Sequence, residues 1–404
     1  MRRTGFVLSI VALCACGDAA PITPPKSAAE LQKVRADRDM SGPPTYDLQK
    51  LPTLGGKTSR GNSINDRDWV AGYVTLADNL SRHAALWRDG QLTDLGTLGG
   101  ANSNVPWPGQ NDRGMIVGIS ETDKPDTLHE DWSCASFFPA TGNVCRGFVW
   151  QDGRMRALPT FGGINGFATG VNNRGQVVGW AETKVQDPTC TKPQILQFRA
   201  ALWEERGRET FQLRPLQGDS TSAATAINDE GQVVGISGDC DVAAGEFSAR
   251  HAVLWDHGRV TRIGDLGGVA WNTPMDINDE GDVVGFSDPP GDADGSFIAH
   301  AFFWSKKDGI ADLGMLAGDG TSQALGINSR REVVGESCGD VACRAVIWKH
   351  GKIYNLNLLM GASFADSLAS AQDINEDGTI TGRLVDATTH LTVPFVATPR
   401  HERH

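Results

Sequence analysis

A single pattern of apolar and polar positions recurs along this chain. In residues 223–228 and 232–237, apolar side chains alternate with small or polar ones, and Asn228-Asp229-Glu230-Gly231 separates the two runs. Alternation with a period of two predicts half-buried strands. Asparagine at the start of the interruption and glycine at its end are typical of a tight turn. The unit is therefore predicted to be a β-hairpin.

The hairpin pattern is repeated seven times, and in each copy a glycine follows the first asparagine by seven positions. A third predicted strand carries a tryptophan in six copies, as in residues 251–255. A fourth, at residues 260–266 in the same copy, combines aliphatic residues with a later glycine. The asparagines that begin the seven turns are Asn65, Asn111, Asn172, Asn228, Asn278, Asn328 and Asn375.

The two ends of the repeat array complement each other. A lone fourth-strand pattern, Leu51, Leu54 and Gly56, precedes the first hairpin, whereas the last third strand, residues 393–397, has no fourth strand after it. Four-stranded antiparallel units with such an end-to-end match are typical of a β-propeller. We therefore predict an all-β, seven-bladed β-propeller over residues 45–399, in which the N-terminal strand closes the last blade, followed by a disordered tail at 400–404. A linear β-solenoid is the alternative, but it would need a shorter period and capping repeats.

The repeats resemble those of the bacterial HAF family of extracellular repeat proteins. His300-Ala301-Phe302 matches the tripeptide that names the family, and the DLGTLGG stretch at residues 94–100 fits as well. The resemblance extends over nearly all of the repeat array. It implies a secreted or surface-exposed repeat protein and no assigned activity.

The first residues read as a processing segment. Arg2 and Arg3 precede an apolar run of about ten residues, which is too short to span a bilayer. The run ends in Leu13-Cys14-Ala15-Cys16, which resembles a bacterial lipobox. We expect a lipoprotein signal peptide at residues 1–15, lipidation of Cys16 and a flexible tether at 16–44. An ordinary secretory signal is the alternative. Lipoproteins retained at the inner membrane often have aspartate directly after the lipidated cysteine. Because Gly17 stands at that position here, we expect an exported, lipid-anchored protein, with the outer membrane or cell surface favoured.

Charge narrows the range of partners. The formal net charge is −12 and the sequence pI about 5.2. Binding to nucleic acids or to anionic membrane surfaces usually depends on clustered lysine and arginine residues. We therefore expect no nucleic-acid partner, membrane contact only through the lipid anchor, and a monomer.

Six cysteines remain after processing, and an even number in an exported protein indicates disulfides. Position in the repeats favours three pairs: Cys134–Cys145, Cys190–Cys240 and Cys338–Cys343. Zinc binding is the alternative, but no pair has CxxC spacing and no histidines cluster beside them. We expect no metal site at the cysteines.

Long loops and aromatic side chains concentrate on one predicted face. The loops between second and third strands are long in several blades and contain the cysteines, whereas the opposite face receives short turns. Aromatic rings among polar residues suit sugar rings or peptide backbones, although they can also pack the loops' own small cores. The predicted ligand-binding residues of this loop-rich face are Trp107, Trp132, Phe137, Phe138, Phe167 and Trp271.

Two loop clusters could carry chemistry. His129-Glu130-Asp131 could supply general acid/base residues, but no second carboxylate partner can be assigned to it from the sequence. The favoured interpretation is that these are solvated charged residues of a loop. Asp292 and Asp294 lie in an oxygen-rich loop that could hold calcium, although it lacks the terminal glutamate of an EF-hand. No other cofactor is expected.

The sequence thus predicts a binding protein more readily than an enzyme. We expect a non-catalytic binding or scaffolding module of the cell envelope, with a polysaccharide, peptide or protein partner on the loop-rich face. The alternative is a carbohydrate-active hydrolase or lyase at the mouth of the central channel. No catalytic residue can be named from the sequence.

Overall fold

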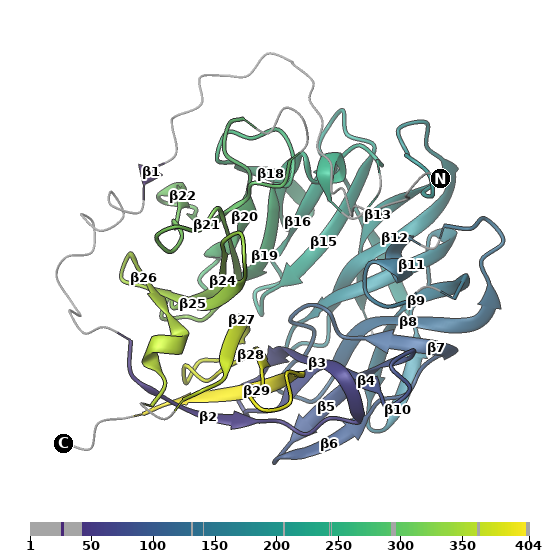
Figure 1. Cartoon of the computed structure of the whole chain (residues 1–404). Coiled ribbons are helices and arrows are strands. Elements are labelled where there is room, and N and C mark those ends of the chain that lie inside the picture. Colours follow the sequence, from purple (N-terminus) through teal and green to yellow (C-terminus); the bar gives the residue numbers. More distant parts are fainter. Residues whose placement is uncertain are drawn as a thin grey trace, which may run out of the picture.

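Seven antiparallel sheets arranged around a central axis make up the protein (Figure 1). The computed structural model describes residues 26–27 and 43–400, except residues 131, 140, 205–206, 242, 244, 292–295 and 362–363, and the side chains at 26–27, 132 and 133. Each blade has four strands, which follow the sequence from the axis to the rim in blades 1 to 6. A parallel bridge between Thr392 and Thr58 links the sheets of blades 7 and 1. The predicted all-β propeller is confirmed.

The first three blades follow one another along the chain. Blade 1 comprises β3 (Gly55–Ile64), β4 (Val70–Leu76), β5 (Arg82–Arg88) and β6 (Gln91–Asp94). Blade 2 comprises β7 (Gly99–Asn104), β8 (Ile116–Pro125), β9 (Asn143–Gln151) and β10 (Arg154–Ala157), with the short helix α2 (Trp132–Ala135) between β8 and β9. Blade 3 comprises β11 (Gly162–Val171), β12 (Val177–Gln186), β13 (Leu196–Glu204) and β14 (Glu209–Leu213).

The next three blades repeat this order. Blade 4 comprises β15 (Thr221–Ile227), β16 (Val233–Gly238), β17 (His251–Asp256) and β18 (Arg259–Gly264), with the 3-10 turn η1 (Glu246–Ala249) before β17. Blade 5 comprises β19 (Thr273–Ile277), β20 (Val283–Ser287), β21 (His300–Ser305) and β22 (Gly309–Asp312). Blade 6 comprises β23 (Thr321–Ile327), β24 (Val333–Cys338), β25 (Cys343–Lys349) and β26 (Lys352–Asn355), followed by η2 (Leu356–Leu359).

Blade 7 is assembled from both ends of the described chain. Its inner strands are β27 (Ser367–Ile374), β28 (Ile380–Val385) and β29 (Thr392–Pro399), and its outer strand is β2 (Tyr46–Lys50). β2 pairs antiparallel with β29, so that Tyr46 lies opposite Pro399 and Lys50 opposite Phe395. The predicted closure of the last blade by the N-terminal strand is confirmed. One further short strand, β1 (Lys26–Ser27), pairs in parallel with the outer strand β22.

The third-strand tryptophans join neighbouring blades. In three blades the indole N–H donates to a carbonyl that follows the outer strand of the preceding blade: Trp87 to Pro52 at 2.8 Å, Trp203 to Pro159 at 3.0 Å and Trp255 to Arg214 at 2.7 Å. These rings are also nearly inaccessible to solvent. A buried indole with its N–H satisfied both fills volume and fixes direction, so these tryptophans act as wedges between blades.

The fourth strands end earlier than the sequence pattern predicts. β18 ends at Gly264, and Leu266 lies in the connection to the next blade, where its amide donates to Ser287 Oγ at 2.9 Å. The same bond is formed between Leu316 and Ser337. The recurring leucine and glycine therefore belong to the connection between blades, because a serine of the next blade's second strand anchors that connection.

The three predicted disulfides are formed. Cys134–Cys145 secures the β8–β9 insertion, Cys338–Cys343 closes the β24–β25 hairpin, and Cys190–Cys240 joins the loops of blades 3 and 4. Disulfides persist in oxidising compartments, and they indicate an extracytoplasmic environment. Among the described residues, no helix is long and apolar enough to cross a membrane.

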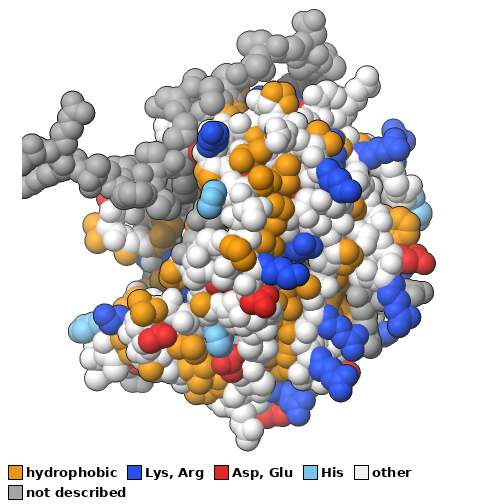
Figure 2. Space-filling model, turned by 90° about the vertical axis from the view of Figure 1, so that its right-hand side faces the viewer, with side chains coloured by type: hydrophobic (Ala, Val, Ile, Leu, Met, Phe, Trp, Pro, Cys, Tyr) orange, Lys and Arg blue, Asp and Glu red, His pale blue; other side chains and the backbone are white. Residues whose placement is uncertain are grey.

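Charge is unevenly distributed over the surface. Figure 2 shows the side near blades 2 and 3, where the charged side chains are mainly Lys and Arg, separated by neutral and hydrophobic ones. The chain as a whole carries a net charge of −12. The acidic excess therefore lies largely elsewhere, and part of it surrounds the short-turn end of the channel, described next.

Candidate functional site

The seven repeat asparagines form a closed ring at the short-turn end of the channel. Each side-chain amide donates to the backbone carbonyl of the next asparagine, over distances of 2.9–3.2 Å, and the last, Asn375, donates to Asn65. Each side-chain oxygen also accepts a backbone N–H of its own turn, as Asn111 does from Met115. The asparagines are buried. They are structural, as the sequence pattern predicts.

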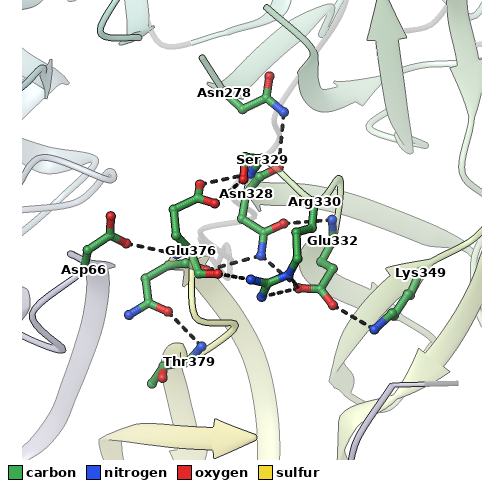
Figure 3. A network of polar contacts seen from close by, with 10 residues as sticks. Asp66, Asn278, Asn328, Ser329, Arg330, Glu332, Lys349, Glu376 and Thr379 are labelled. Carbon is green, nitrogen blue, oxygen red and sulfur yellow. Dashed lines mark hydrogen bonds and ion pairs between the residues drawn. The ribbon is translucent and has the colours of Figure 1, made fainter. Parts of the chain in front are cut away.

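The residues that follow the asparagines form a second set of hydrogen bonds between neighbouring blades, alongside this ring. The Glu376 carboxylate accepts the Ser329 amide at 2.9 Å, and the Glu376 amide donates to Asp66 at 3.0 Å (Figure 3). The asparagines and the residues that follow them line a cavity of about 440 Å³. Its acidic lining comprises Asp66, Asp112, Asp229, Asp279, Glu280 and Glu376.

Two further carboxylates lie inside the wall of the channel. Asp276 Oδ2 accepts the Ile327 amide of the next blade at 2.9 Å, and Asp373 Oδ2 accepts that of Ile64 at 2.8 Å. Gly326 packs against Asp373, since a Cβ there would stand 3.1 Å from Asp373 Oδ1. Burial, followed by the charges of Glu376 and Asp279, raises the pKa of Asp276 to about 6. Burial, followed by the charge of Asp276, raises the pKa of Asp373 well above its ordinary value.

These two carboxyl groups predict a stability that falls as pH rises. A raised folded-state pKa means that the folded protein binds more protons than the unfolded one above about pH 4, so stability decreases between there and the folded pKa. At about 1.4 kcal/mol per pKa unit, the raised pKa of Asp276 alone corresponds to a free-energy penalty of about 3 kcal/mol at pH 7, and Asp373 adds to it in the same direction. We expect the melting temperature to decrease from pH 5 to pH 8, and Asp276→Asn with Asp373→Asn to flatten that slope. A slope that is equal in the double variant and in an exposed Asp123→Asn control would contradict this assignment.

Trp107 lies within the channel, and it contacts blades that are not adjacent. It belongs to a segment inserted between β7 and β8, and its indole N–H lies 3.4 Å from Met275 Sδ in blade 5. Its ring also packs edge-on against Phe167 of blade 3 and Phe137 of the β8–β9 insertion, with centroids 5.3 and 5.5 Å apart. Trp107 therefore fills the channel on the side of blades 2 to 5.

The other predicted ligand-binding aromatics are distributed between cores and surface. Phe138 and Phe167 are buried with the disulfide cysteines in one apolar cluster, and Trp271 is buried in another. Phe137, like Trp107, is only partly buried. The side chain of Trp132 lies outside the described residues, as do Asp292, Asp294 and Cys16. Ligand contact thus stays a prediction for Trp107 and Phe137, whereas the buried rings pack the loops.

The repeat pattern breaks on the opposite side of the channel. One position of the second strand follows the recurring glycine, and its side chain shares a face of the sheet with the first-strand residue paired to it. In blades 2 to 5 the second-strand residue is hydrophobic, whereas blades 6 and 7 have charged residues there. From blade 1 to blade 7 the pairs are Tyr73 with Arg60, Ile119 with Asn104, Trp180 with Phe167, Ile236 with Ala223, Phe286 with Thr273, Glu336 with Gln323, and Arg383 with Ser370.

Three guanidinium groups gather at this break. Arg60 donates to Gln372 Oε1 of blade 7, and Arg82 lies over the Tyr73 ring, 4.2 Å from its centroid. Arg383 lies 3.7 Å from Glu336, the one carboxylate of the group. We define the polar sector as Arg60, Tyr73, Arg82, Gln323, Glu336, Gln372 and Arg383. With three arginines and one glutamate, it carries a net positive charge.

The polar sector borders the β8–β9 insertion of the loop-rich face, and its positive charge is incompletely paired. Arg82 begins β5 directly after a loop of that face and donates to the Phe137 carbonyl of the β8–β9 insertion. The Nε groups of Arg60, Arg82 and Arg383 are buried without a hydrogen-bond partner. Burial is the main cause that lowers the pKa of Arg60 to about 10, and the positive charges of Arg383 and Arg82 add to it. The negative charges of ionised Tyr73 and of Glu336 act in the opposite direction. The sector therefore has unsatisfied donors for an anion.

The basic residues that begin the third strands are not part of this charge. His83, His251 and His300 each contact an aspartate, Asp94, Asp219 and Asp312, at 2.8–3.0 Å, and Arg344 pairs with Asp319. The hydrogen bond to Asp312 also raises the pKa of His300. These pairs satisfy four of the basic groups locally, whereas Nη1 of Arg199, at the same place in blade 3, is buried without a hydrogen-bond partner.

Glu130 is buried, and the interpretation as solvated loop charge is wrong for it. Its side chain has no accessible surface, and its Oε1 accepts the Ile195 and Leu196 amides at 2.7 and 2.5 Å. The second carboxylate that the sequence could not assign is Glu182 of β12, which is equally inaccessible. Because both are sealed from solvent, neither can reach a substrate in this conformation.

Comparison with known proteins assigns no family to this chain. No family model matches the chain, and no curated protein matches it. Three solved structures of similar shape are a gluconolactonase, XC5397 from Xanthomonas campestris (TM-score 0.36, 10% identity, 96% of this chain and 100% of that one), the polysaccharide lyase Uly1 (0.44, 9%, 93% and 96%), and an oligogalacturonate lyase in complex with manganese (0.39, 12%, 89% and 97%). At these identities and TM-scores the likenesses carry no argument about activity.

Proposed function

We propose that this protein is a lipid-anchored binding module of the cell envelope that takes a carboxylate-bearing polysaccharide into the polar sector through its loop-rich face. The observation that carries the proposal is the convergence of Arg60, Arg82 and Arg383 at the place where the blade repeat breaks. A structural position tends to be repeated in every blade, as the asparagine ring is. A binding site for one ligand needs a difference between blades.

The chemistry of the sector supports an acidic ligand. Arginine offers a planar fork of donors that matches a carboxylate, and a bond of this kind is stronger than a neutral one. The unpartnered Nε groups are costly when buried, and an anion would satisfy them. The net charge of −12 opposes a polyanion only at long range, because physiological salt screens charges beyond about 8 Å.

The neighbouring side chains favour a sugar acid over a simple anion. Gln323 and Gln372 supply amide groups suited to hydroxyls, and Glu336 supplies a further acceptor beside Arg383. Trp107 and Phe137 are only partly buried and pack against each other, and the Phe137 carbonyl accepts from Arg82 of the sector. Apolar rings beside polar donors and acceptors are a common arrangement for carbohydrate binding.

Export and anchoring complete the proposal. The three disulfides support an oxidising location. The lipobox-like sequence that ends at Cys16 supports attachment through a lipid. A propeller held at the membrane by a tether would present its loop-rich face to polysaccharides of the envelope.

Calorimetric titration of the full-length protein with acidic and neutral oligosaccharides tests the proposal. We expect binding of oligouronides, and a loss of affinity of at least about tenfold in Arg60→Gln and in Arg383→Gln, since one charge-assisted bond contributes roughly 1.5–3 kcal/mol. Arg113→Gln, an exposed arginine on a short turn, is the matched control and should bind as the wild type does.

Two results would contradict the proposal. Equal affinity for neutral and acidic chains, or no effect of either sector variant, would exclude the arginines as ligand contacts. The second result would come from chromatography of the oligouronide after prolonged incubation. Shortened products would show that the protein cleaves the chain, as a hydrolase or lyase does.

A further inference from the structure

We propose that Glu130, Glu182 and Gln194 form a calcium site that fastens the long β8–β9 insertion to blade 3. Glu130 comes from this insertion, Glu182 from β12 and Gln194 from the β12–β13 loop. All three side chains are at most 1% exposed. This site is separate from the polar sector, and it does not depend on the proposed function.

The hydrogen bonds around these groups leave acceptors unused. Glu130 Oε1 accepts two backbone amides, but its Oε2 is buried without a partner. The Gln194 amide group donates to Glu182 Oε1 at 3.3 Å, which leaves Gln194 Oε1 buried without a partner as well. A buried polar atom without a hydrogen bond is costly. Gln194 contacts the Glu182 carboxylate, and the charge of Glu130 acts on the same carboxylate. The two unpaired oxygens therefore point to a missing electron-pair acceptor beside Glu182.

The charge of the cluster calls for a cation. Glu130 and Glu182 are enclosed with a third buried carboxylate, that of Asp126. Among the described residues neither glutamate forms a salt bridge, and Arg146 is the cation whose charge acts on Glu182 at longer range. Asn165 donates to Asp126 Oδ2 at 3.2 Å, to Glu182 Oε1 at 3.4 Å and to the backbone carbonyl of Glu130 at 3.5 Å, but it is neutral. An uncompensated buried carboxylate is strongly unfavourable. A bound divalent cation would remove the repulsion between the two glutamates.

The donor set selects the kind of ion. Carboxylate and amide oxygens are the ligands of hard cations, and the absence of a described histidine or free thiol in the set excludes the usual zinc ligands. Calcium accepts irregular geometry and completes its shell with carbonyls or water, whereas magnesium requires a near-ideal octahedron. Two glutamates and one amide from three different segments suit the more tolerant ion.

The consequence is a loop-rich face whose order depends on calcium. The insertion that holds Glu130 also carries Phe137, whose carbonyl accepts from Arg82. The Cys134–Cys145 disulfide secures the insertion within blade 2, whereas the proposed ion would fix it to blade 3. Its removal should therefore loosen the insertion and leave the blades in place.

Thermal unfolding of the full-length protein, first stripped with a chelator, tests the site. We expect 1 mM calcium chloride to raise the melting temperature by about 3–6 °C, if the ion is present at about 100 times its Kd. Glu130→Gln and Glu182→Gln should abolish the increase. Glu209→Gln, an exposed glutamate of β14, should retain it. Hydrogen exchange of residues 126–139 should slow on calcium addition in the wild type, a readout that does not depend on whether the variants fold.

Each other outcome overturns the proposal. No calcium response, with a higher melting temperature in Glu182→Gln than in the wild type, would show that the two glutamates share a proton instead. A response that persists in both glutamine variants would place the ion elsewhere, for example at the acidic cavity of the short-turn face. A rise in melting temperature with magnesium but not with calcium would show that the proposed ion is wrong.

Discussion

Asn111→Ala is expected to lower the free energy of unfolding by about 3–5 kcal/mol, although the side chain touches no ligand. Asn111 Oδ1 accepts the Arg113 and Met115 amides at 3.1 and 2.9 Å, and its amide donates to the Asn172 carbonyl at 2.9 Å. Alanine would remove three hydrogen bonds, each contributing about 1 kcal/mol, and leave buried backbone groups without partners. It would also open the ring that joins all seven blades.

Denaturant unfolding with Gln91→Ala as control measures this effect. Gln91 is an exposed amide on an outer strand, and its loss should change stability by less than about 0.5 kcal/mol. A loss below about 1 kcal/mol for Asn111→Ala would mean that water replaces the side chain without cost, and that the ring is a consequence of the fold and not a support for it.

Tyr46→Ala is the second large change, because it weakens the closure of the propeller. Tyr46 is 2% exposed and packs in a cluster with Leu356, Met360 and Phe395, which connects blades 6 and 7. Removal of a buried aromatic ring costs about 3–5 kcal/mol. Because β29 is the one described strand that pairs along β2, and Tyr46 also bridges Met360, the loss of the ring should favour detachment of β2.

Hydrogen exchange locates the effect of Tyr46→Ala. Amides of β29 and β2 should exchange faster, whereas those of β15 and β16 on the far side of the ring should change little. Asp47→Ala is the control: Asp47 pairs with Arg400 at the surface, and exposed pairs contribute about 0–1 kcal/mol. Uniform acceleration in all blades would show that the propeller opens as one unit and that β2 has no special role.

The repeat made most of the fold predictable. The turns at Asn228 and its equivalents have the same chemistry seven times, and the unmatched pattern around Leu51 predicts how the ring closes. The role of the recurring glycines was not predictable in this way. A Cβ at Gly235 would lie 2.1 Å from the Ala223 carbonyl oxygen, so the glycine serves the close approach of the first strand more than that of the third-strand tryptophan. That approach follows a β-bulge, which periodicity does not specify.

The candidate site was less accessible to prediction. Aromatic residues in loops cannot be divided into buried and exposed ones by pattern alone. Trp107, for example, contacts Met275, which lies 168 residues further along the chain. The polar sector did leave a signal, because Glu336 and Arg383 occupy positions where blades 2 to 5 have hydrophobic residues. An alignment of the repeats with each other would have found it. The burial of Glu130 against Glu182 left none, because it depends on how one insertion packs on the next blade.

The charge requirement of the polar sector is tested most directly by titrating the wild-type protein with one oligouronide and with the methyl ester of the same oligouronide. The two ligands have nearly the same shape and differ in charge. We predict that esterification weakens binding at least tenfold, since the guanidinium groups of Arg60 and Arg383 would lose their anionic partner. Equal affinity for the two forms would contradict the assignment of the polar sector as a carboxylate site.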